Sequence, residues 1–266
     1  MFIPKRKELY VKSVILAGGL GTRLREETEY RPKPMVEIGG RPILWHIMKN
    51  LSHQNLNDFI ICLGYKGDHI KDYFLNYSTR ANDITIELGA DTPIHRHGNS
   101  EEEHWRVTLA NTGLNTMTGG RIFKIRDYVN GERFLCTYGD GLADVDIEGL
   151  LDFHLEHKRI ATVTAVRPTS RFGSIDIDSE NIVKRFTEKP RAEKWVNGGF
   201  FIFEPRVFDY LDANSILEQG PLDNLASDGQ LMAFQHSGFW QPMDTYRESQ
   251  ELNDLWFDSK APWKNW

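Results

Sequence analysis

The stretch Ser13-Val14-Ile15-Leu16-Ala17-Gly18-Gly19-Leu20-Gly21-Thr22-Arg23-Leu24 decides how the chain folds. Its first five residues form a short apolar run, which is typical of a parallel strand buried on both faces. The glycines that follow would let backbone N–H groups surround phosphate oxygens. The loop lacks the third glycine of a dinucleotide-binding fingerprint and the Lys-Ser/Thr pair of a P-loop. The sequence therefore predicts a strand and a loop that either binds phosphate or simply turns the chain.

Strand and helix patterns alternate after this loop. Apolar residues recur at helical spacing over residues 43–51, 70–77, 122–129 and 147–155, and strands are indicated over 59–63, 84–88, 134–138 and 161–166. Such alternation predicts an α/β fold with an open, doubly wound parallel sheet. Beyond Pro168 the pattern changes to short strands over 174–177, 182–187 and 200–203. Because ligands of open α/β sheets bind outside the carboxyl ends of the strands, this irregular half is expected to form a second wall of the binding cleft.

Composition excludes several classes of protein. The 266 residues carry a net charge of −6, which argues against broad electrostatic binding to nucleic acid or to an anionic membrane. No apolar run approaches the ~20 residues of a membrane span, and the charged segment Met1–Tyr10 precedes no long apolar stretch. A cytoplasmic protein is therefore expected. Cys62 and Cys136, the only cysteines, lie in apolar runs and are interpreted as core thiols.

Two cations strengthen the phosphate hypothesis. Arg23 ends the glycine loop with a permanent charge and a planar fork suited to phosphate. Lys33 lies between Pro32 and Pro34, which hold the chain extended and direct the lysine. Asp140 follows the apolar run 134–138 between two glycines, where it is either a metal ligand or simply the end of a strand. Asp244 alone would be interpreted as a helix cap or a surface residue.

The sequence resembles the sugar-nucleotide pyrophosphorylases, nucleotidyltransferases that join a nucleoside triphosphate to a sugar 1-phosphate. The glycine loop with the downstream Lys33-Pro34 carries the resemblance, which extends from residue 11 to residue 266 and is greatest to the family's cytidylyltransferases. The matching blocks are Pro34-Met35-Val36-Glu37-Ile38-Gly39-Gly40, Trp45-His46-Ile47-Met48, Met117-Thr118-Gly119-Gly120-Arg121, Tyr138-Gly139-Asp140-Gly141, Arg171-Phe172-Gly173, Glu188-Lys189-Pro190, Asn197-Gly198-Gly199-Phe200-Phe201, Phe239-Trp240-Gln241-Pro242-Met243-Asp244-Thr245 and Ala261-Pro262-Trp263-Lys264.

This resemblance implies a Rossmann-like sheet, dependence on Mg²⁺, and formation of CDP-glucose and pyrophosphate from CTP and glucose 1-phosphate. It also implies a homo-oligomer. Residues 1–10 would be an extension, 11–166 the nucleotide-binding half, 167–245 a β-rich sugar-binding half, and 246–266 a helical, aromatic tail that docks on the body or on a partner subunit.

The resemblance assigns roles to individual residues. Arg23 and Lys33 are the expected catalytic cations, and Asp140 and Asp244 the expected metal ligands. The expected nucleotide contacts are Leu16, Ala17, Gly18, Gly19, Leu20, Gly21, Thr22, Arg23, Lys33, Thr116, Arg121 and Gly139. The expected sugar-phosphate contacts are Gly173, Glu188, Lys189, Asn197 and Gly198.

The motifs also fit other functions. The same reaction with UTP, dTTP or another sugar 1-phosphate fits the motifs, because base and sugar choice rest on a few hydrogen bonds. Asp144 and Asp146 form an Asp-x-Asp pair like that of many glycosyltransferases, but their place before a helical pattern favours capping. The glycine loop disfavours a glycosyltransferase, because such a loop suits a triphosphate. The presence of Arg23, Lys33, Asp140 and Asp244 together disfavours a sugar-nucleotide sensor without catalytic activity. The polar segment 91–104, with three histidines, is interpreted as a solvated insertion rather than a metal site.

Overall fold

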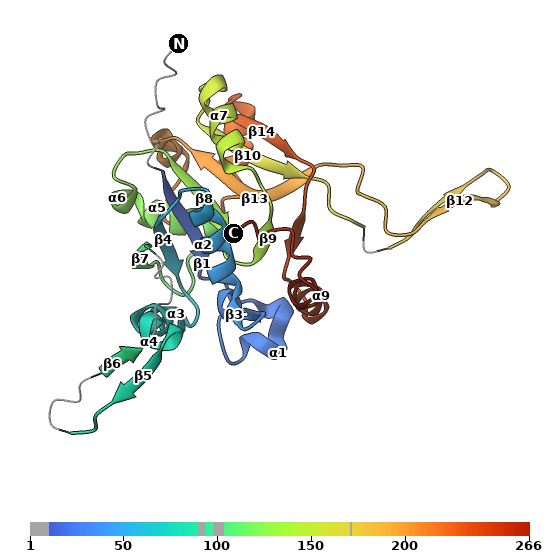
Figure 1. Ribbon diagram of the computed structural model, residues 1–266. Coiled ribbons are helices and arrows are strands. Elements are labelled where there is room, and N and C mark those ends of the chain that lie inside the picture. The colour runs from blue at the N-terminus through green and yellow to red at the C-terminus, as the bar shows by residue number, and fades with distance from the viewer. Residues whose placement is uncertain (1–10, 90–93, 98–103, 171) are drawn as a thin grey trace, which may run out of the picture.

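The computed structural model describes residues 11–89, 94–97, 104–170 and 172–266, and its centre is a seven-stranded sheet (Figure 1). Neighbouring strands are parallel except that β13 (Val196–Phe203) is antiparallel to both β8 (Phe134–Tyr138) and β10 (Ala161–Val166). The α/β fold with a mostly parallel sheet is thus confirmed. In spatial order the strands are β14 (Leu231–His236), β10 (Ala161–Val166), β13 (Val196–Phe203), β8 (Phe134–Tyr138), β1 (Lys12–Ala17), β4 (Asp58–Leu63) and β7 (Arg106–Asn111).

Helices cover both faces of this sheet because alternate residues of its central strands point to opposite sides. Ile15 and Ala17 of β1 pack in a core with helices α2 (Ile43–His53), α3 (Gly67–Leu75), α7 (Ile147–His157) and α9 (Tyr246–Phe257). Val14 and Leu16 pack on the other face against α5 (Thr118–Lys124), α6 (Arg126–Val129) and α8 (Pro221–Ser227). Burying a side chain the size of Ile15 contributes roughly 1.5–3 kcal/mol.

The strand order reverses beside β1. The chain runs from β1 to β4 and on to β7 in one direction, and then returns to place β8 on the opposite side of β1. At such a reversal the connections leave to opposite faces, so a crevice opens at the carboxyl ends of the two strands. The glycine loop follows β1 at this edge, and Gly139 and Asp140 follow β8. The fold therefore brings the two motifs together.

Two hairpins project from the body (Figure 1). One is formed by β5 (Asp83–Ile86) and β6 (Ile94–His97), the other by β11 (Ser174–Ile177) and β12 (Val183–Thr187). The strand predicted over 84–88 is real, but it pairs with β6 and not with the central sheet, so that part of the prediction is wrong. Its alternating isoleucines remain exposed. The sheet position belongs to β7, a strand that was not predicted from the sequence.

Several local predictions concern short segments. Asp146 caps α7 by accepting a hydrogen bond from the Gly149 amide at 3.0 Å, as predicted. Asp144 instead accepts a hydrogen bond from the Phe239 amide at 2.6 Å, so the predicted capping role of Asp144 was wrong.

The remaining short elements are η1 (Thr22–Leu24), α1 (Arg25–Thr28), η2 (Lys33–Met35), β2 (Glu37–Ile38), β3 (Arg41–Pro42), α4 (Tyr77–Ala81), β9 (Gly141–Ala143), η3 (Pro205–Tyr210) and β15 (Trp240–Pro242).

The aromatic tail docks on the body. Trp263 is fully buried, and Asn50 of α2 donates a hydrogen bond to its carbonyl at 3.1 Å. Both cysteines are buried free thiols, as predicted. The extension 1–10, Glu101–Glu103 and Arg171 lie outside the described residues. No helix in the described ranges is long and apolar enough to cross a membrane.

Candidate active site

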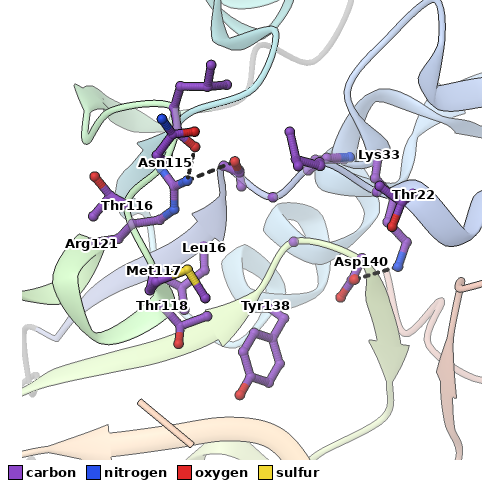
Figure 2. A pocket seen from close by; sticks show the side chains of 18 of the residues that line it. Leu16, Thr22, Lys33, Asn115, Thr116, Met117, Thr118, Arg121, Tyr138 and Asp140 are labelled. Carbon is purple, nitrogen blue, oxygen red and sulfur yellow. Dashed lines mark hydrogen bonds and ion pairs between the residues drawn. The ribbon is translucent and has the colours of Figure 1, made fainter. Parts of the chain in front are cut away.

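A cavity of about 510 Å³ lies at the carboxyl ends of β1 and β8 (Figure 2). Figure 2 shows Arg121 and Thr116 on one side of it, Lys33 and Thr22 on the other, and Tyr138 between them. Asp140 lines this cavity. So do all the residues predicted to contact the nucleotide, namely Leu16, Ala17, Gly18, Gly19, Leu20, Gly21, Thr22, Arg23, Lys33, Thr116, Arg121 and Gly139. The structure brings this predicted set together, and the contacts themselves stay a prediction.

Arg121 is the buried anchor of the glycine loop. Its guanidinium donates five hydrogen bonds, among them one to the Gly18 carbonyl at 2.9 Å and one to the Leu63 carbonyl at 3.0 Å. A Cβ on Gly18 would collide with the guanidinium, so only glycine allows this approach. Burial lowers the pKa of the Arg121 guanidinium from its ordinary value. Gly21 has φ +64°, where a side chain is strained, and this turn directs the chain into η1.

Lys33 lies at the centre of the charged part of the site. Pro32 is extended, with φ −68° and ψ 149°, but Lys33 is the first residue of the short helix η2 and Pro34 the second. The predicted extended backbone at Lys33 was therefore wrong, although the two proline rings still restrict the backbone on either side of the lysine. The Lys33 Nζ donates to Asp140 Oδ2 at 2.6 Å and to Asp244 Oδ1 at 2.6 Å. Its side chain is only 9% exposed. A buried ammonium thus bridges two carboxylates.

Backbone pairing sets the positions of these two carboxylates. β9 and β15 pair antiparallel, with Gly141 opposite Pro242, and the Met243 amide donates to the Asp140 carbonyl at 2.8 Å. Asp244 precedes Thr245, the N-cap residue of α9, and Glu248 of that helix accepts a hydrogen bond from the Asp244 amide at 2.8 Å. The capping box of α9 therefore holds Asp244 beside Asp140. Arg23 Nη1 completes the cluster with a 2.6 Å ion pair to Asp244 Oδ2.

A second cavity of about 380 Å³ adjoins the first, since Arg23, Tyr138 and Asp140 line both. The predicted sugar contacts Asn197 and Gly198 line it, together with Asp244. Burial and the neighbouring Glu218 carboxylate raise the pKa of Tyr138, so its hydroxyl stays protonated at neutral pH. The two cavities therefore meet at the cluster of Arg23, Lys33 and the aspartates.

Three predicted sugar contacts lie elsewhere. Gly173 immediately precedes β11, and Glu188 and Lys189 immediately follow β12, at the base of the projecting hairpin. None of them lines either cavity. The structure does not bring this part of the predicted site together with the rest.

Other lining residues were not predicted. Asn115, Met117 and Thr118 line the larger cavity, Glu218 and Trp240 the smaller, and Tyr138 both. Thr118 and Tyr138 stand inside quoted family blocks, so their position beside the predicted contacts was an available signal. Glu218 lies in a loop without a recognisable pattern, and sequence offered no signal for it.

The charged cluster suits a divalent cation. Oxygens of Asp140 and Asp244 converge on one point, which Lys33 Nζ occupies. One or two carboxylates plus substrate phosphates is the usual ligand set of Mg²⁺. Within the described ranges no group of three or more His, Cys, Asp and Glu side chains forms a self-sufficient metal site. A metal ion held by these two carboxylates would complete its coordination with water or with substrate oxygens.

Comparison with known proteins places the chain in a family. The family model described as nucleotidyl transferase matches residues 12–240. The chain belongs to the nucleotidyl transferase family. Members of this family are typically metal-dependent enzymes, which agrees with the converging aspartates. The resemblance predicted from the sequence is thereby confirmed.

Individual relatives are similar over nearly the whole chain. The glucose-1-phosphate cytidylyltransferase of Salmonella typhi is 52% identical over 96% of this chain and 100% of that protein. A probable glucose-1-phosphate cytidylyltransferase of Bacillus subtilis is 43% identical over 96% and 100%. A crystal structure of an apo UDP-glucose pyrophosphorylase has a TM-score of 0.68 over 94% of this chain and 99% of that one. At 16% identity, this last similarity concerns the fold alone.

Proposed function

We propose that the protein transfers a cytidylyl group from CTP to glucose 1-phosphate, giving CDP-glucose and pyrophosphate. The observation that carries this proposal is the meeting of two cavities at one cluster of Arg23, Lys33, Asp140 and Asp244. The full-length similarity to the Salmonella typhi enzyme supports the choice of substrates. The nucleotide occupies the larger cavity and the sugar phosphate the smaller one.

In this reaction a phosphate oxygen of the sugar phosphate attacks the α-phosphorus of CTP. A new phosphorus–oxygen bond forms, the α–β bridging bond breaks, and pyrophosphate leaves with the bonding electron pair. The attacking phosphate is already anionic at neutral pH, because its second pKa is ~6, so no side chain has to remove a proton. The barrier comes from repulsion between two anions and from charge on the leaving group.

The residues of the junction lower that barrier by position and charge. Lys33 and Arg23 are cations that line the larger cavity beside the glycine loop, where they neutralise the phosphates. The glycine loop presents backbone amides to the triphosphate, and the anchor Arg121 keeps that loop in place. Holding both substrates in line supplies the remaining acceleration.

Mg²⁺ would be held by Asp140 and Asp244 together with phosphate oxygens. When bound, it would neutralise charge on the triphosphate. Thr116, Arg121 and Gly139 would contact the nucleotide, and Asn197 and Gly198 the sugar phosphate. Gly173, Glu188 and Lys189 are not part of this proposal, because they line neither cavity.

The test is the stoichiometry of product release. Purified protein with Mg²⁺, CTP and glucose 1-phosphate should release one pyrophosphate for each CDP-glucose, and nothing when either substrate is omitted. Release of pyrophosphate from CTP alone would indicate a hydrolase and overturn the proposal. Release of a nucleoside diphosphate from added CDP-glucose would indicate a glycosyltransferase instead.

We also propose that the chain forms a homo-oligomer. The hairpin of β11 and β12 exposes Ile175, Ile177, Val183 and Phe186, each at least half exposed. A lone two-stranded hairpin is marginally stable in water, so a covering surface would stabilise these apolar side chains. Light scattering coupled to size-exclusion chromatography should give a multiple of the 30.8 kDa chain mass, whereas a single-chain mass would contradict the proposal.

A further inference from the structure

Glu218 is a fixed carboxylate in the wall of the smaller cavity. One of its oxygens accepts a hydrogen bond from Thr118 Oγ1 at 2.7 Å, and the other accepts from the Tyr138 hydroxyl. Asn197 in turn donates to the Tyr138 hydroxyl at 3.3 Å. Because burial and Glu218 keep Tyr138 protonated, that hydroxyl donates to the carboxylate. Glu218 thus connects α5, which begins at Thr118, to β8, which ends at Tyr138.

The loop that carries Glu218 is firmly held against α5. The Leu217 amide donates to Thr118 Oγ1 at 2.9 Å, and the Gly120 amide donates to the Ser215 carbonyl at 2.8 Å. Leu217 is fully buried in the core of that face. The Glu218 carboxylate is therefore positioned before any ligand arrives, which lowers the entropy cost of using it.

The bonding of Glu218 differs from that of the other carboxylates in the cavity. Asp140 and Asp244 are paired with the cations Lys33 and Arg23. In the described part of the chain, Glu218 forms no ion pair, and its two partners are neutral hydroxyls. A carboxylate can accept about four hydrogen bonds, so the Glu218 carboxylate can accept further hydrogen bonds from a ligand in the cavity. A hydroxyl of the ligand is a donor of the right kind.

We infer that Glu218 accepts a hydrogen bond from a hydroxyl of the hexose and is a specificity-determining residue for the sugar 1-phosphate. The inference rests on the proposed function. Glu188 was expected to accept a hydrogen bond from a sugar hydroxyl, but it does not line the smaller cavity. Glu218 does line it and would supply a carboxylate for that role. A sugar that lacks the hydroxyl leaves the remaining acceptor site of the Glu218 carboxylate unfilled, and a sugar with its own carboxylate is repelled.

The test measures how each protein variant discriminates between glucose 1-phosphate and analogues that lack one hydroxyl. The values of kcat/KM are measured for wild type, Glu218→Gln and Glu218→Ala with glucose 1-phosphate and with its 2-, 3-, 4- and 6-deoxy analogues. Wild type should lose about 10- to 100-fold with one analogue, the range expected for a hydrogen bond to a charged group. Glu218→Ala should be weakened with the parent sugar and should no longer distinguish it from that analogue.

A matched control separates recognition from folding. Asp223→Asn removes a nearby carboxylate that lines neither cavity, and it should discriminate among the analogues as wild type does. The KM for CTP should change much less than the sugar discrimination in both Glu218 variants. The inference is overturned if Glu218→Ala slows all five sugars equally, if it keeps the discrimination of wild type, or if wild type itself discriminates against none.

These outcomes are distinct from failure of the proposed function. If wild type uses another sugar 1-phosphate, the substrate proposal is wrong, and the deoxy series of that sugar tests Glu218 in the same way. If wild type uses no sugar phosphate, both proposals are overturned. Thermal unfolding of Glu218→Gln, which preserves side-chain volume, checks that the comparison is made on folded protein.

Discussion

Replacing Lys33 by methionine should strengthen metal binding while it abolishes most catalysis. The Lys33 Nζ lies 2.6 Å from an oxygen of Asp140 and 2.6 Å from an oxygen of Asp244. The two oxygens are therefore about 5 Å apart at most, and at an effective dielectric constant of ~20 two unit charges at that distance repel by about 3 kcal/mol. In the native protein the ammonium offsets this repulsion, and an entering cation competes with it.

In Lys33→Met only the metal can offset the repulsion. The affinity of the nucleotide-free protein for Mn²⁺ should therefore rise, by up to about 100-fold if the full ~3 kcal/mol is recovered. The turnover number should fall by about 100-fold or more, because a cation that neutralises the reacting phosphates is gone. Methionine keeps most of the buried apolar stem, so the fold should persist.

Electron paramagnetic resonance of free Mn²⁺ measures the affinity, and pyrophosphate release measures turnover. Lys71→Met is the control, since Lys71 forms an exposed ion pair with Asp68 at 3.3 Å and lines neither cavity. It should change neither quantity. Unchanged or weaker Mn²⁺ binding in Lys33→Met, or turnover near that of wild type, would refute the bridging role of Lys33.

Three further predictions concern single residues. Arg121→Met should lower the free energy of unfolding by more than about 3 kcal/mol in urea titrations, because five hydrogen bonds lose their donor; a loss under about 1 kcal/mol would contradict the anchor role. Burial lowers the pKa of His46 from 6.5 to about 4. Between pH 6.5 and pH 4 the unfolded chain therefore binds more protons than the folded protein, so the free energy of unfolding should decrease as the pH falls through this range. The decrease should be smaller in His46→Gln. An equal pH dependence of the free energy of unfolding in both proteins would contradict this role of His46. Asp140→Asn should fold normally and lose metal-dependent turnover, whereas a Mg²⁺ titration like that of wild type would remove Asp140 from the metal site.

Local pattern was sufficient to predict the elements that form the nucleotide side of the site. The apolar run before Gly18 became β1, and the helical spacing after residue 43 became α2. A strand buried on both faces needs a continuous apolar run, and a helix packed on a sheet needs one apolar stripe. Both requirements appear within ten or so neighbouring residues, where sequence pattern is informative.

Pairing between distant strands was beyond local pattern. β13 inserts antiparallel between β8 and β10, although its apolar residues 200–203 were assigned to the irregular half. β7 is a sheet edge with mixed burial, so its run Arg106–Asn111 has a weak apolar signal. The alternation of Ile84 and Ile86 predicted a strand correctly but could not specify its partner.

The same limit applies to the site. Asp140 and Asp244 meet because β9 pairs with β15 and α9 has a capping box, and only the family resemblance paired them in advance. Glu218 approaches the cavity through a loop held by Thr118 and Gly120, which are about 100 positions away in the chain. Glu188 and Lys189 matched the family motif, yet the hairpin places them outside both cavities. A motif specifies residue types, and tertiary structure decides which of them share a cavity.

The most direct test of the central claim is an internal competition. Equal concentrations of CTP, UTP, dTTP, ATP and GTP are offered together to the purified protein with Mg²⁺ and glucose 1-phosphate, and the nucleotide sugars formed are identified by mass spectrometry. The account predicts CDP-glucose as the dominant product, in amounts equal to the pyrophosphate released. A different nucleotide sugar as the main product, or pyrophosphate without any nucleotide sugar, would contradict it.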